Sequence, residues 1–273
     1  MIASDALRKV RRELFIPETI WVPVEGTGWY RPLRRADDPA GWRAEVESDR
    51  SVITQVDDGA TERGVWPTSS SSASHIMATM LDGLRILPGM RVLEIGTGTG
   101  YNAALLAEMA GAENVTTIEI DTSLAKHAQA SLERAGYPVT VVSGDGVEGH
   151  WPGAPYDRII VTAAVAEVPY AWVEQTRAGG IIIAPWVASF HPDEPLLTLE
   201  VKPDGTAEGR FGSPAWFMPM RGRRLPQHII RATDERWAAA GRPEASRYGV
   251  TVTPETQTIW LDTPTNPQSE GMS

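Results

Sequence analysis

The sequence predicts an α/β fold built on a doubly wound, mostly parallel sheet, and three observations point to it. Between residues 74 and 186, apolar stripes at helical spacing alternate with short apolar runs. These runs, such as "RVLEIG", are nearly continuous in hydrophobicity, as expected for strands that helices cover on both faces. A glycine run, "GTGTG", directly follows the first strand, where folds of this class bring ligands close to the backbone.

Each expected element has a local signal. A helix should run from Ser74 to about residue 84, with Ser74 as its cap and the "PG" at 88–89 as its stop. Segment 195–212 predicts a hairpin, because "PDG" is turn chemistry, and it would add antiparallel strands to one edge of the sheet. The other expected elements are strands at 91–96, 114–120, 139–144, 156–165 and 179–186, and helices at 101–110, 121–136 and 167–178.

Composition and charge exclude several classes of protein. The 273 residues include no cysteine, which excludes disulfides, thiolate zinc sites and a cysteine nucleophile. No run has the character of a signal peptide or a membrane span, so we expect a cytoplasmic protein with no membrane partner. The net charge of −10 argues against a nucleic-acid partner. His127 and His150 lack companions at metal-ligand spacing, so no metal is expected.

Acidic residues lie in or at the ends of three successive strands: Glu94, Glu119 and Asp145. Glu119 is placed to accept hydrogen bonds from a ribose diol, and Asp145 from an exocyclic adenine amine. The "GTGTG" spacing lacks the G-x-G-x-x-G form that seats a pyrophosphate. Three acids without a phosphate-binding lysine suit a cationic nucleoside, so S-adenosylmethionine fits and NAD or ATP does not. Each acid taken alone is equally consistent with a solvated carboxylate at a strand end.

Five blocks of the sequence resemble successive motifs of the protein-L-isoaspartate O-methyltransferase family, over roughly residues 10–222: "RVLEIGTGTGYNAALLA", "VTTIEID", "GDGVEGHWPGAPYDRIIVTAA", "VPYAWVEQTRAGG" and "FMPMRGR". The resemblance implies a Rossmann-like methyltransferase fold that uses S-adenosylmethionine and releases S-adenosylhomocysteine. It implies methyl transfer to the side carboxylate of an isoaspartyl residue in a polypeptide. The residues then expected at the cofactor are Glu94, Gly96, Thr97, Gly98, Tyr101, Asn102, Glu119, Ile120, Asp145, Gly146 and Thr162.

Amino-acid composition and the family resemblance together divide the chain into three parts. Residues 1–73 form an N-terminal segment on the substrate side, which is rich in proline, tryptophan and charged residues and shows little hydrophobic periodicity. Residues 74–222 form the S-adenosylmethionine-binding methyltransferase domain, and residues 223–273 form a C-terminal extension. The polar tail 263–273 is expected to be disordered, and the protein is expected to be a monomer.

A serine run precedes the first helix of the methyltransferase domain. The family places a serine that holds the acceptor carboxylate in a segment matched here by "SSSASH", so the resemblance gives that role to Ser72, with Ser70 and Ser71 as further candidates. The family's isoleucine and proline are replaced by Ser71 and Ser74. Hydroxyl donors suit a carboxylate that is already ionised and needs only to be held in place. The residues alone favour a flexible linker with a helix cap.

Three more residues are candidates for binding the substrate: His75, Arg221 and Arg223. The arginines of "RGRR" would attract an acidic peptide to a protein of net negative charge, or they belong to a solvated loop. His75 lies on the first turn of a helix beside the serine run, where a packing or capping group is favoured over a general base.

The long N-terminal segment and the tail resemble a narrower branch of the family. "LFIPETIW" and "RYGVTVTPETQTIWLD" are similar to actinobacterial enzymes that accompany ribosomally made modified peptides such as graspetides, lanthipeptides and lasso peptides. This implies methylation of an aspartate in a cyclised precursor peptide, after which the ester loses methanol to give an aspartimide. The alternatives are an enzyme of general isoaspartate repair and a non-catalytic binding module.

Overall fold

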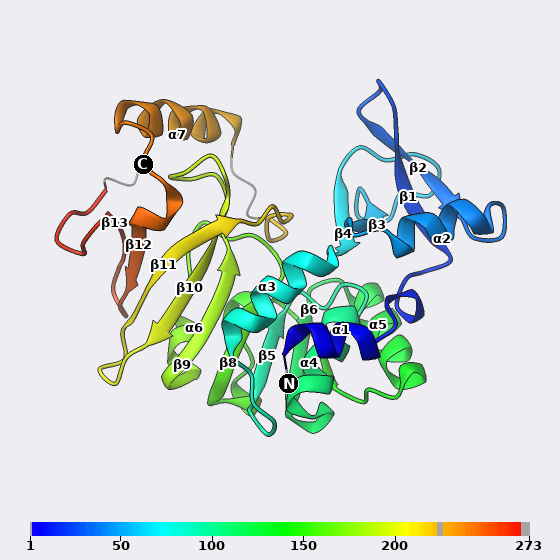
Figure 1. Cartoon of the computed structure of the whole chain (residues 1–273), viewed down its shortest axis with the longest axis horizontal. Coiled ribbons are helices and arrows are strands. Elements are labelled where there is room, and N and C mark those ends of the chain that lie inside the picture. Colours follow the sequence, from blue (N-terminus) through cyan, green and yellow to red (C-terminus); the bar gives the residue numbers. More distant parts are fainter. Residues whose placement is uncertain (1, 223–225, 269–273) are drawn as a thin grey trace. The chain divides into compact units, whose positions relative to one another are not determined.

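A computed structural model of the chain describes residues 2–222 and 226–268. It divides the chain into two compact units. Unit 1 comprises Met1–Gly89 and Thr97–Gly144, and unit 2 comprises Met90–Gly96 and Asp145–Ser273. The elements of each unit are drawn in Figure 1.

The helical part of unit 1 holds most of the elements that the sequence predicted there. Strands β6 and β7 pair in parallel, with Thr116 opposite Thr140, and α1 packs against α3 and α4 (Figure 1). The elements are α1 (Ala3–Lys9), α3 (Ser74–Leu84), α4 (Tyr101–Ala110), β6 (Val115–Glu119), α5 (Thr122–Ala135) and β7 (Thr140–Ser143). Gly136 ends α5 in a left-handed conformation, which glycine adopts readily.

The predicted cap of α3 is wrong. Ala73 is the N-cap and makes no side-chain capping bond, while Ser74 is already the first helical residue. The carboxylate of Asp49, from a distant part of the chain, accepts a hydrogen bond of 3.2 Å from the backbone N–H of His75 instead. A capping group supplied by tertiary structure leaves no local sequence signal.

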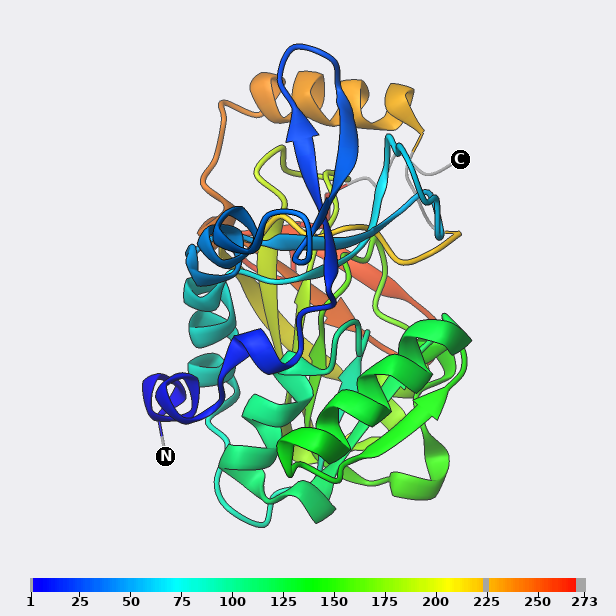
Figure 2. The same cartoon turned by 90° about the vertical axis from the view of Figure 1, so that its right-hand side faces the viewer.

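The N-terminal segment of unit 1 is an antiparallel sheet with the strand order β2-β1-β3-β4. Its strands are β1 (Thr19–Val24), β2 (Trp29–Arg34), β3 (Val52–Val56) and β4 (Pro67–Ser71), and α2 (Pro39–Glu47) lies between β2 and β3 in the chain. Ile20, Trp42 and Val52 belong to its buried core. Figure 2 shows the β1–β2 hairpin extending beyond the other two strands. Most of the serine run is therefore strand β4, and the flexible-linker interpretation is wrong.

Unit 2 contains the other strands, in the order β13-β12-β11-β10-β9-β8-β5. Strands β5, β8 and β9 are parallel, and β10 to β13 continue the sheet in antiparallel fashion. The predicted hairpin is confirmed as β10 and β11. The elements are β5 (Val92–Ile95), β8 (Tyr156–Val161), α6 (Tyr170–Glu174), β9 (Thr176–Pro185), β10 (Pro195–Val201), β11 (Ala207–Pro214), α7 (Gln227–Ala239), β12 (Tyr248–Val252) and β13 (Gln257–Leu261).

Two expectations in unit 2 need correction. The helix predicted over 167–178 is the short α6, because Pro169 keeps the chain extended before it and Thr176 already pairs with Tyr156 of β8. The tail is ordered as far as it is described, since the N–H of Gln268 donates to the carbonyl of Ile259 at 2.8 Å. Residues 269–273 of that predicted disordered tail lie outside the described residues.

The pairing and order of the elements confirm the predicted α/β fold with parallel strands and an antiparallel edge. The division at residues 73 and 222 stays a prediction. In the part of the chain that the structure describes, no helix is long and apolar enough to cross a membrane.

Candidate functional site

In unit 1, the glycine loop is joined to the acid at the end of β6. The backbone N–H of Gly98 donates a hydrogen bond of 2.9 Å to Oε2 of Glu119, and the N–H of Asp121 donates one of 3.0 Å to Oε1. Glu119 is only 7% exposed. Both of its oxygens are therefore oriented by the backbone, and the carboxylate offers acceptors and no donor to a ligand.

The serine strand, β4, lies against the same glycine loop. A Cβ built on Gly98 would lie 3.5 Å from the backbone oxygen of Ser70 and 3.7 Å from Oγ of Ser69. Gly98 itself has a φ of +53°, a left-handed conformation that favours glycine. Unit 1 thus brings together the predicted cofactor loop and the predicted acceptor residues, which the sequence separates by more than twenty positions.

The serine hydroxyls fall into two sets because side chains alternate along a strand. Ser69 and Ser71 are buried, and their hydroxyls bond to Thr54 at 3.2 Å and Arg12 at 3.1 Å. Ser70 and Ser72 alternate with them and are half-buried. Of the three predicted serines, Ser71 is therefore held within the protein, while Ser70 and Ser72 keep partly exposed side chains.

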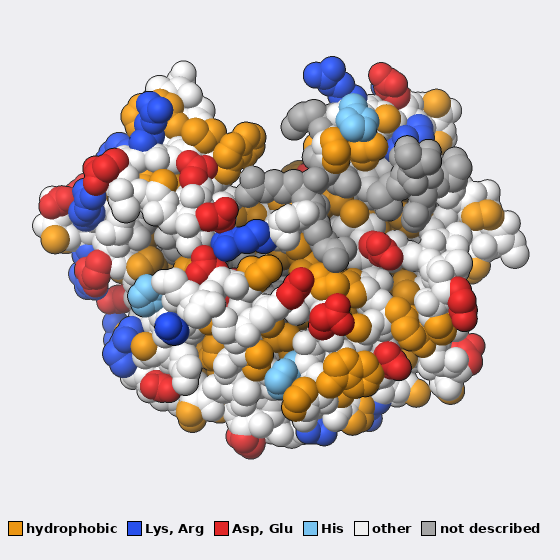
Figure 3. All heavy atoms as spheres, turned by 180° about the vertical axis from the view of Figure 1, so that it is seen from behind, with side chains coloured by type: hydrophobic (Ala, Val, Ile, Leu, Met, Phe, Trp, Pro, Cys, Tyr) orange, Lys and Arg blue, Asp and Glu red, His pale blue; other side chains and the backbone are white. Residues whose placement is uncertain are grey.

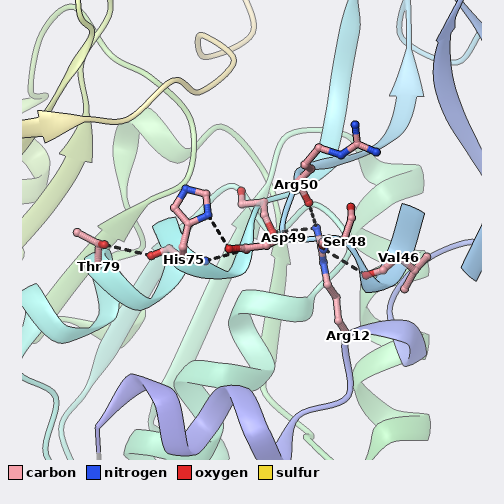
Figure 4. Close-up of polar contacts among 8 residues, drawn as sticks. Arg12, Val46, Ser48, Asp49, Arg50, His75 and Thr79 are labelled. Atoms are coloured by element: carbon pink, nitrogen blue, oxygen red, sulfur yellow. Dashed lines mark hydrogen bonds and ion pairs between the residues drawn. The ribbon is translucent and has the colours of Figure 1, made fainter. Parts of the chain in front are cut away.

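Arg12 fixes the end of the serine strand, a role for which the sequence contains no local signal. Its guanidinium, in a residue only 9% exposed, donates to Oγ of Ser71 and to the backbone oxygens of Ser71 at 2.8 Å and Ser72 at 3.0 Å. It also donates to the carbonyls of Val46, Ser48 and Arg50 (Figure 4). These acceptors lie 34 to 60 positions away in the chain, so only tertiary structure reveals the contact.

Burial shifts the titration of the groups in this cluster. Burial lowers the pKa of Arg12, and the nearby Tyr101 and Asp49 partly offset that effect. Burial likewise raises the pKa of the Tyr101 phenol, against the opposing influence of Arg12 and a hydrogen bond with Ser74. The Tyr101 ring lies 5.9 Å from that of Phe15, centroid to centroid. Tyr101, predicted at the cofactor, is therefore packed into the core of unit 1.

His75 is exposed at the start of α3, where Asp49 orients it. Its Nδ1 lies 3.1 Å from Oδ2 of Asp49, and Thr79 donates to its backbone oxygen (Figure 4). Desolvation is the largest single influence on Asp49 and raises its pKa, but the hydrogen bonds from the backbone and ring of His75 together outweigh it, so the pKa is lowered overall. With Nδ1 engaged, the other ring nitrogen of His75 is the one available to a peptide.

Three more predicted residues of unit 1 differ in exposure. Thr97 is buried, and its hydroxyl lies 2.7 Å from that of Thr117. Asn102 is also buried, at 8% exposure. Ile120 is 44% exposed although it directly follows Glu119, so it presents an apolar surface beside an acceptor-only carboxylate.

In unit 2, the glycines predicted at the cofactor allow neighbouring strand ends to pack closely. A Cβ on Gly146 would lie 2.4 Å from Cγ2 of Ile95, and one on Gly96 would lie 2.6 Å from Oγ1 of Thr162. Thr162 also donates to the backbone oxygen of Ile95 at 3.2 Å. These glycines are thus required by neighbouring side chains, and ligand approach is not needed to explain them.

The acids of unit 2 have different surroundings. Glu94 is fully buried within β5, whereas Asp145 is exposed and accepts a hydrogen bond of 3.0 Å from the N–H of Val147. Arg221 is exposed, and Arg223 lies outside the described residues. Within residues 2–222 and 226–268, no group of three or more His, Asp and Glu side chains is arranged to hold a metal ion. On the face drawn in Figure 3, acidic and basic side chains of the described residues are interspersed.

Comparison with known proteins gives concordant results. The family model described as "Protein-L-isoaspartate(D-aspartate) O-methyltransferase" matches residues 54–224, more than half of the chain. A protein-L-isoaspartate O-methyltransferase of Pyrococcus horikoshii is 43% identical over 152 residues, which cover 55% of this chain and 68% of the relative. One of Gloeobacter violaceus is 44% identical over 159 residues, which cover 58% of this chain and 75% of the relative.

Solved structures show the same fold. A protein-L-isoaspartate O-methyltransferase structure superposes with a TM-score of 0.69 at 22% identity and covers 96% of this chain and 95% of its own. A Plasmodium falciparum structure titled as a beta-aspartate methyltransferase, in complex with S-adenosyl-L-homocysteine, superposes with a TM-score of 0.57 at 15% identity and covers 80% of this chain and 89% of its own. At these identities the likeness establishes the Rossmann-like α/β fold.

Proposed function

The chain belongs to the protein-L-isoaspartate O-methyltransferase family, and on that premise we propose that it methylates the side carboxylate of isoaspartyl residues in polypeptides. It is an S-adenosylmethionine-dependent carboxyl methyltransferase with the Rossmann-like fold of that class. The observation that carries the proposal is the contact between the serine strand and Gly98, the residue whose N–H bonds to Glu119. The residues proposed to hold the acceptor and the methyl donor would thereby meet within one unit.

The residues present fit the cofactor. Glu119 would accept from the ribose hydroxyls, and the exposed Ile120 would pack against the adenine. In unit 2, Asp145 is exposed and would accept from the adenine amine, while Glu94, Gly96, Gly146 and Thr162 shape the strand ends beside it. When bound, S-adenosylmethionine supplies a methyl group attached to a positively charged sulfur, and a carboxylate oxygen can attack the carbon of that methyl group.

The protein's part in the reaction is positioning. A substrate carboxylate is ionised near neutral pH, so no base is required. The hydroxyls of Ser70 and Ser72 would donate to the carboxylate and hold one oxygen toward the methyl group without neutralising it. Arg12 supports them by fixing the backbone at Ser71 and Ser72. His75 would contact the peptide through the ring nitrogen that Asp49 leaves available, and Arg221 and Arg223 would attract acidic peptides.

Paired peptides test this function. The protein is incubated with labelled S-adenosylmethionine and a short isoaspartyl peptide, and in parallel with the aspartyl peptide of the same sequence. We expect methyl incorporation into the isoaspartyl peptide alone. Binding of S-adenosylhomocysteine without methylation of any isoaspartyl peptide would contradict the proposal and support a binding module.

A second candidate substrate is an aspartate in a cyclised ribosomal peptide, as in the actinobacterial branch. It is favoured by the similarity of two segments to enzymes of that branch: "LFIPETIW", which leads into β1, and "RYGVTVTPETQTIWLD", which forms β12 and β13. The N-terminal and C-terminal extensions do not by themselves favour this substrate, because a solved protein-L-isoaspartate O-methyltransferase aligns with 96% of the chain. Mass spectrometry of a cyclised precursor distinguishes the two. This substrate gains a methyl ester, and attack of a backbone amide nitrogen on that ester then expels methanol and leaves an aspartimide.

The three-part division of the chain is also a proposal. Residues 1–73 would form the acceptor side, since they include the serine strand and Arg12, and residues 74–222 would hold the cofactor. Residues 223–273 would form an extension that includes α7, β12 and β13.

A further inference from the structure

Gln55 faces the serine strand at an irregular point of the small sheet. Its Cα is paired with that of Ser69, and the register between β3 and β4 shifts on both sides of this pair. Bulges of this kind re-aim a side chain and are common beside active sites. The side chain of Gln55 is therefore directed by a local departure from regular pairing.

The two ends of the Gln55 amide connect different parts of unit 1. Nε2 donates to Oδ2 of Asp121 at 3.2 Å, while Oε1 accepts from Oγ1 of Thr68 at 2.8 Å. Thr68 belongs to the serine strand, and Asp121 follows β6. The reverse amide orientation would place two acceptors against each other at Asp121, so these partners determine which end points where.

Asp121, which accepts the hydrogen bond from Gln55, also donates one to Glu119. Its backbone N–H donates to Oε1 of Glu119 at 3.0 Å, and its Oδ1 caps α5 by accepting from the N–H groups of Ser123 and Leu124. Hydrogen bonds therefore run without a break from Thr68 of the serine strand, through Gln55 and Asp121, to Glu119.

We propose that Gln55 is a positioning residue that sets the serine strand against Glu119 and so makes acceptor binding and cofactor binding depend on each other. The inference rests on the proposed function, in which the serine hydroxyls hold the acceptor carboxylate and Glu119 holds the cofactor ribose. The physical basis is alignment: methyl transfer needs the acceptor oxygen in line with the methyl group, and a misplacement of about 1 Å can cost about 100-fold in rate. The bond from Gln55 ends on a carboxylate, which makes it stronger than a bond between neutral groups.

Gln55→Ala and Gln55→Glu test the proposal. Alanine removes both hydrogen bonds, and glutamate places a second carboxylate against Asp121. The matched controls are Gln129→Ala and Gln129→Glu, since Gln129 is an exposed residue of α5 whose Nε2 likewise donates to a carboxylate oxygen, that of Glu133, at 3.1 Å. The measurements are kcat and KM for an isoaspartyl peptide, and the Kd of S-adenosylhomocysteine with and without that peptide.

In the wild-type protein we expect the peptide to tighten S-adenosylhomocysteine binding about fivefold or more. In Gln55→Ala that factor should fall toward one and kcat should drop about tenfold, while the Kd measured without peptide stays within about threefold. Gln55→Glu should lose more activity than Gln55→Ala, because like charges then face each other. Both Gln129 variants should match the wild type.

Several outcomes would overturn the inference. One is a Gln55→Ala protein with wild-type kcat and an unchanged peptide effect on S-adenosylhomocysteine binding. Another is a uniform loss of binding that follows a fall in thermal stability, which would indicate only a structural role. If Gln55→Ala does not fold, Thr68→Val removes the other end of the connection, and an unaltered peptide effect there contradicts the inference equally. A wild-type protein that methylates no isoaspartyl peptide would mean that the proposed function itself has failed.

Discussion

Glu119 is oriented by Gly98, whose backbone N–H donates to its Oε2 at 2.9 Å. Asp121 donates in the same way to Oε1 at 3.0 Å, so both carboxylate oxygens already accept backbone hydrogen bonds. The second lone pair of each oxygen remains for a ligand. This relationship connects the glycine run to the acid at the end of β6.

Glu119→Gln should weaken S-adenosylhomocysteine binding by at least about tenfold, or roughly 1.4 kcal/mol. A glutamine must point its NH₂ group at one of the two backbone donors, which leaves a repulsive contact and a misplaced side chain. Titration calorimetry measures the effect. Glu133→Gln, an exposed glutamate of α5, is the control and should bind as the wild type does. Equal affinity in the two variants would contradict the assignment of Glu119.

Gly98→Ala should impair methyl transfer, whereas Gly136→Ala should not. Both glycines have positive φ, at +53° and +84°, so alanine costs each position about 1 kcal/mol or more of stability. Only at Gly98 would the new Cβ enter the space between the glycine loop and the serine strand, since nothing lies within 4 Å of one at Gly136. Denaturant unfolding and a methylation assay separate the two effects. If both variants lose activity equally, backbone strain alone is responsible.

Arg12→Met should destabilise the protein by about 3 kcal/mol or more, because it leaves several buried carbonyl groups without their donor. Arg12→Lys should recover only part of this, since an ammonium group cannot reproduce the planar fork of donors. The neighbouring Arg11 forms an exposed ion pair with Glu13, so Arg11→Met should cost less than about 1 kcal/mol. Denaturation curves give the comparison, and equal losses at the two positions would refute the role of Arg12.

Asp49 should contribute to stability in a pH-dependent way. Because the folded state lowers its pKa from the ordinary 3.8, the contribution is fully present above that value and is lost as the pH falls through the lowered pKa. Asp49→Asn keeps a capping side chain but removes the charge, so its difference from the wild type should be largest near neutral pH and should vanish in strong acid. The exposed Asp37→Asn is the control. A difference for Asp49→Asn that does not change between pH 7 and pH 2 would contradict this.

Patterns confined to one element were predictable from the sequence. The apolar runs of β5, β6 and β8 and the hairpin of β10 and β11 appear where their residues indicated, because burial on both faces and turn chemistry each leave a local signal. α6 is shorter than predicted because pairing of Thr176 with β8 overrides local helical preference. The folded sheet at residues 19–71 was not predicted, since its short strands are interrupted by a helix and by irregular register.

The kind of chemistry was also predicted. The glycine run after a strand and the acids at strand ends indicated the methyl donor, and the resemblance of the serine run to a family motif indicated the acceptor site. Which of these residues lie close together was decided only by tertiary structure. It places Gly98 beside Ser70, turns Ser71 inward to Arg12, and connects Gln55 to Asp121. The physical reason is that a side chain's partners depend on which distant segments fold against it, and contacts between residues 28 to 66 positions apart leave no periodicity to read.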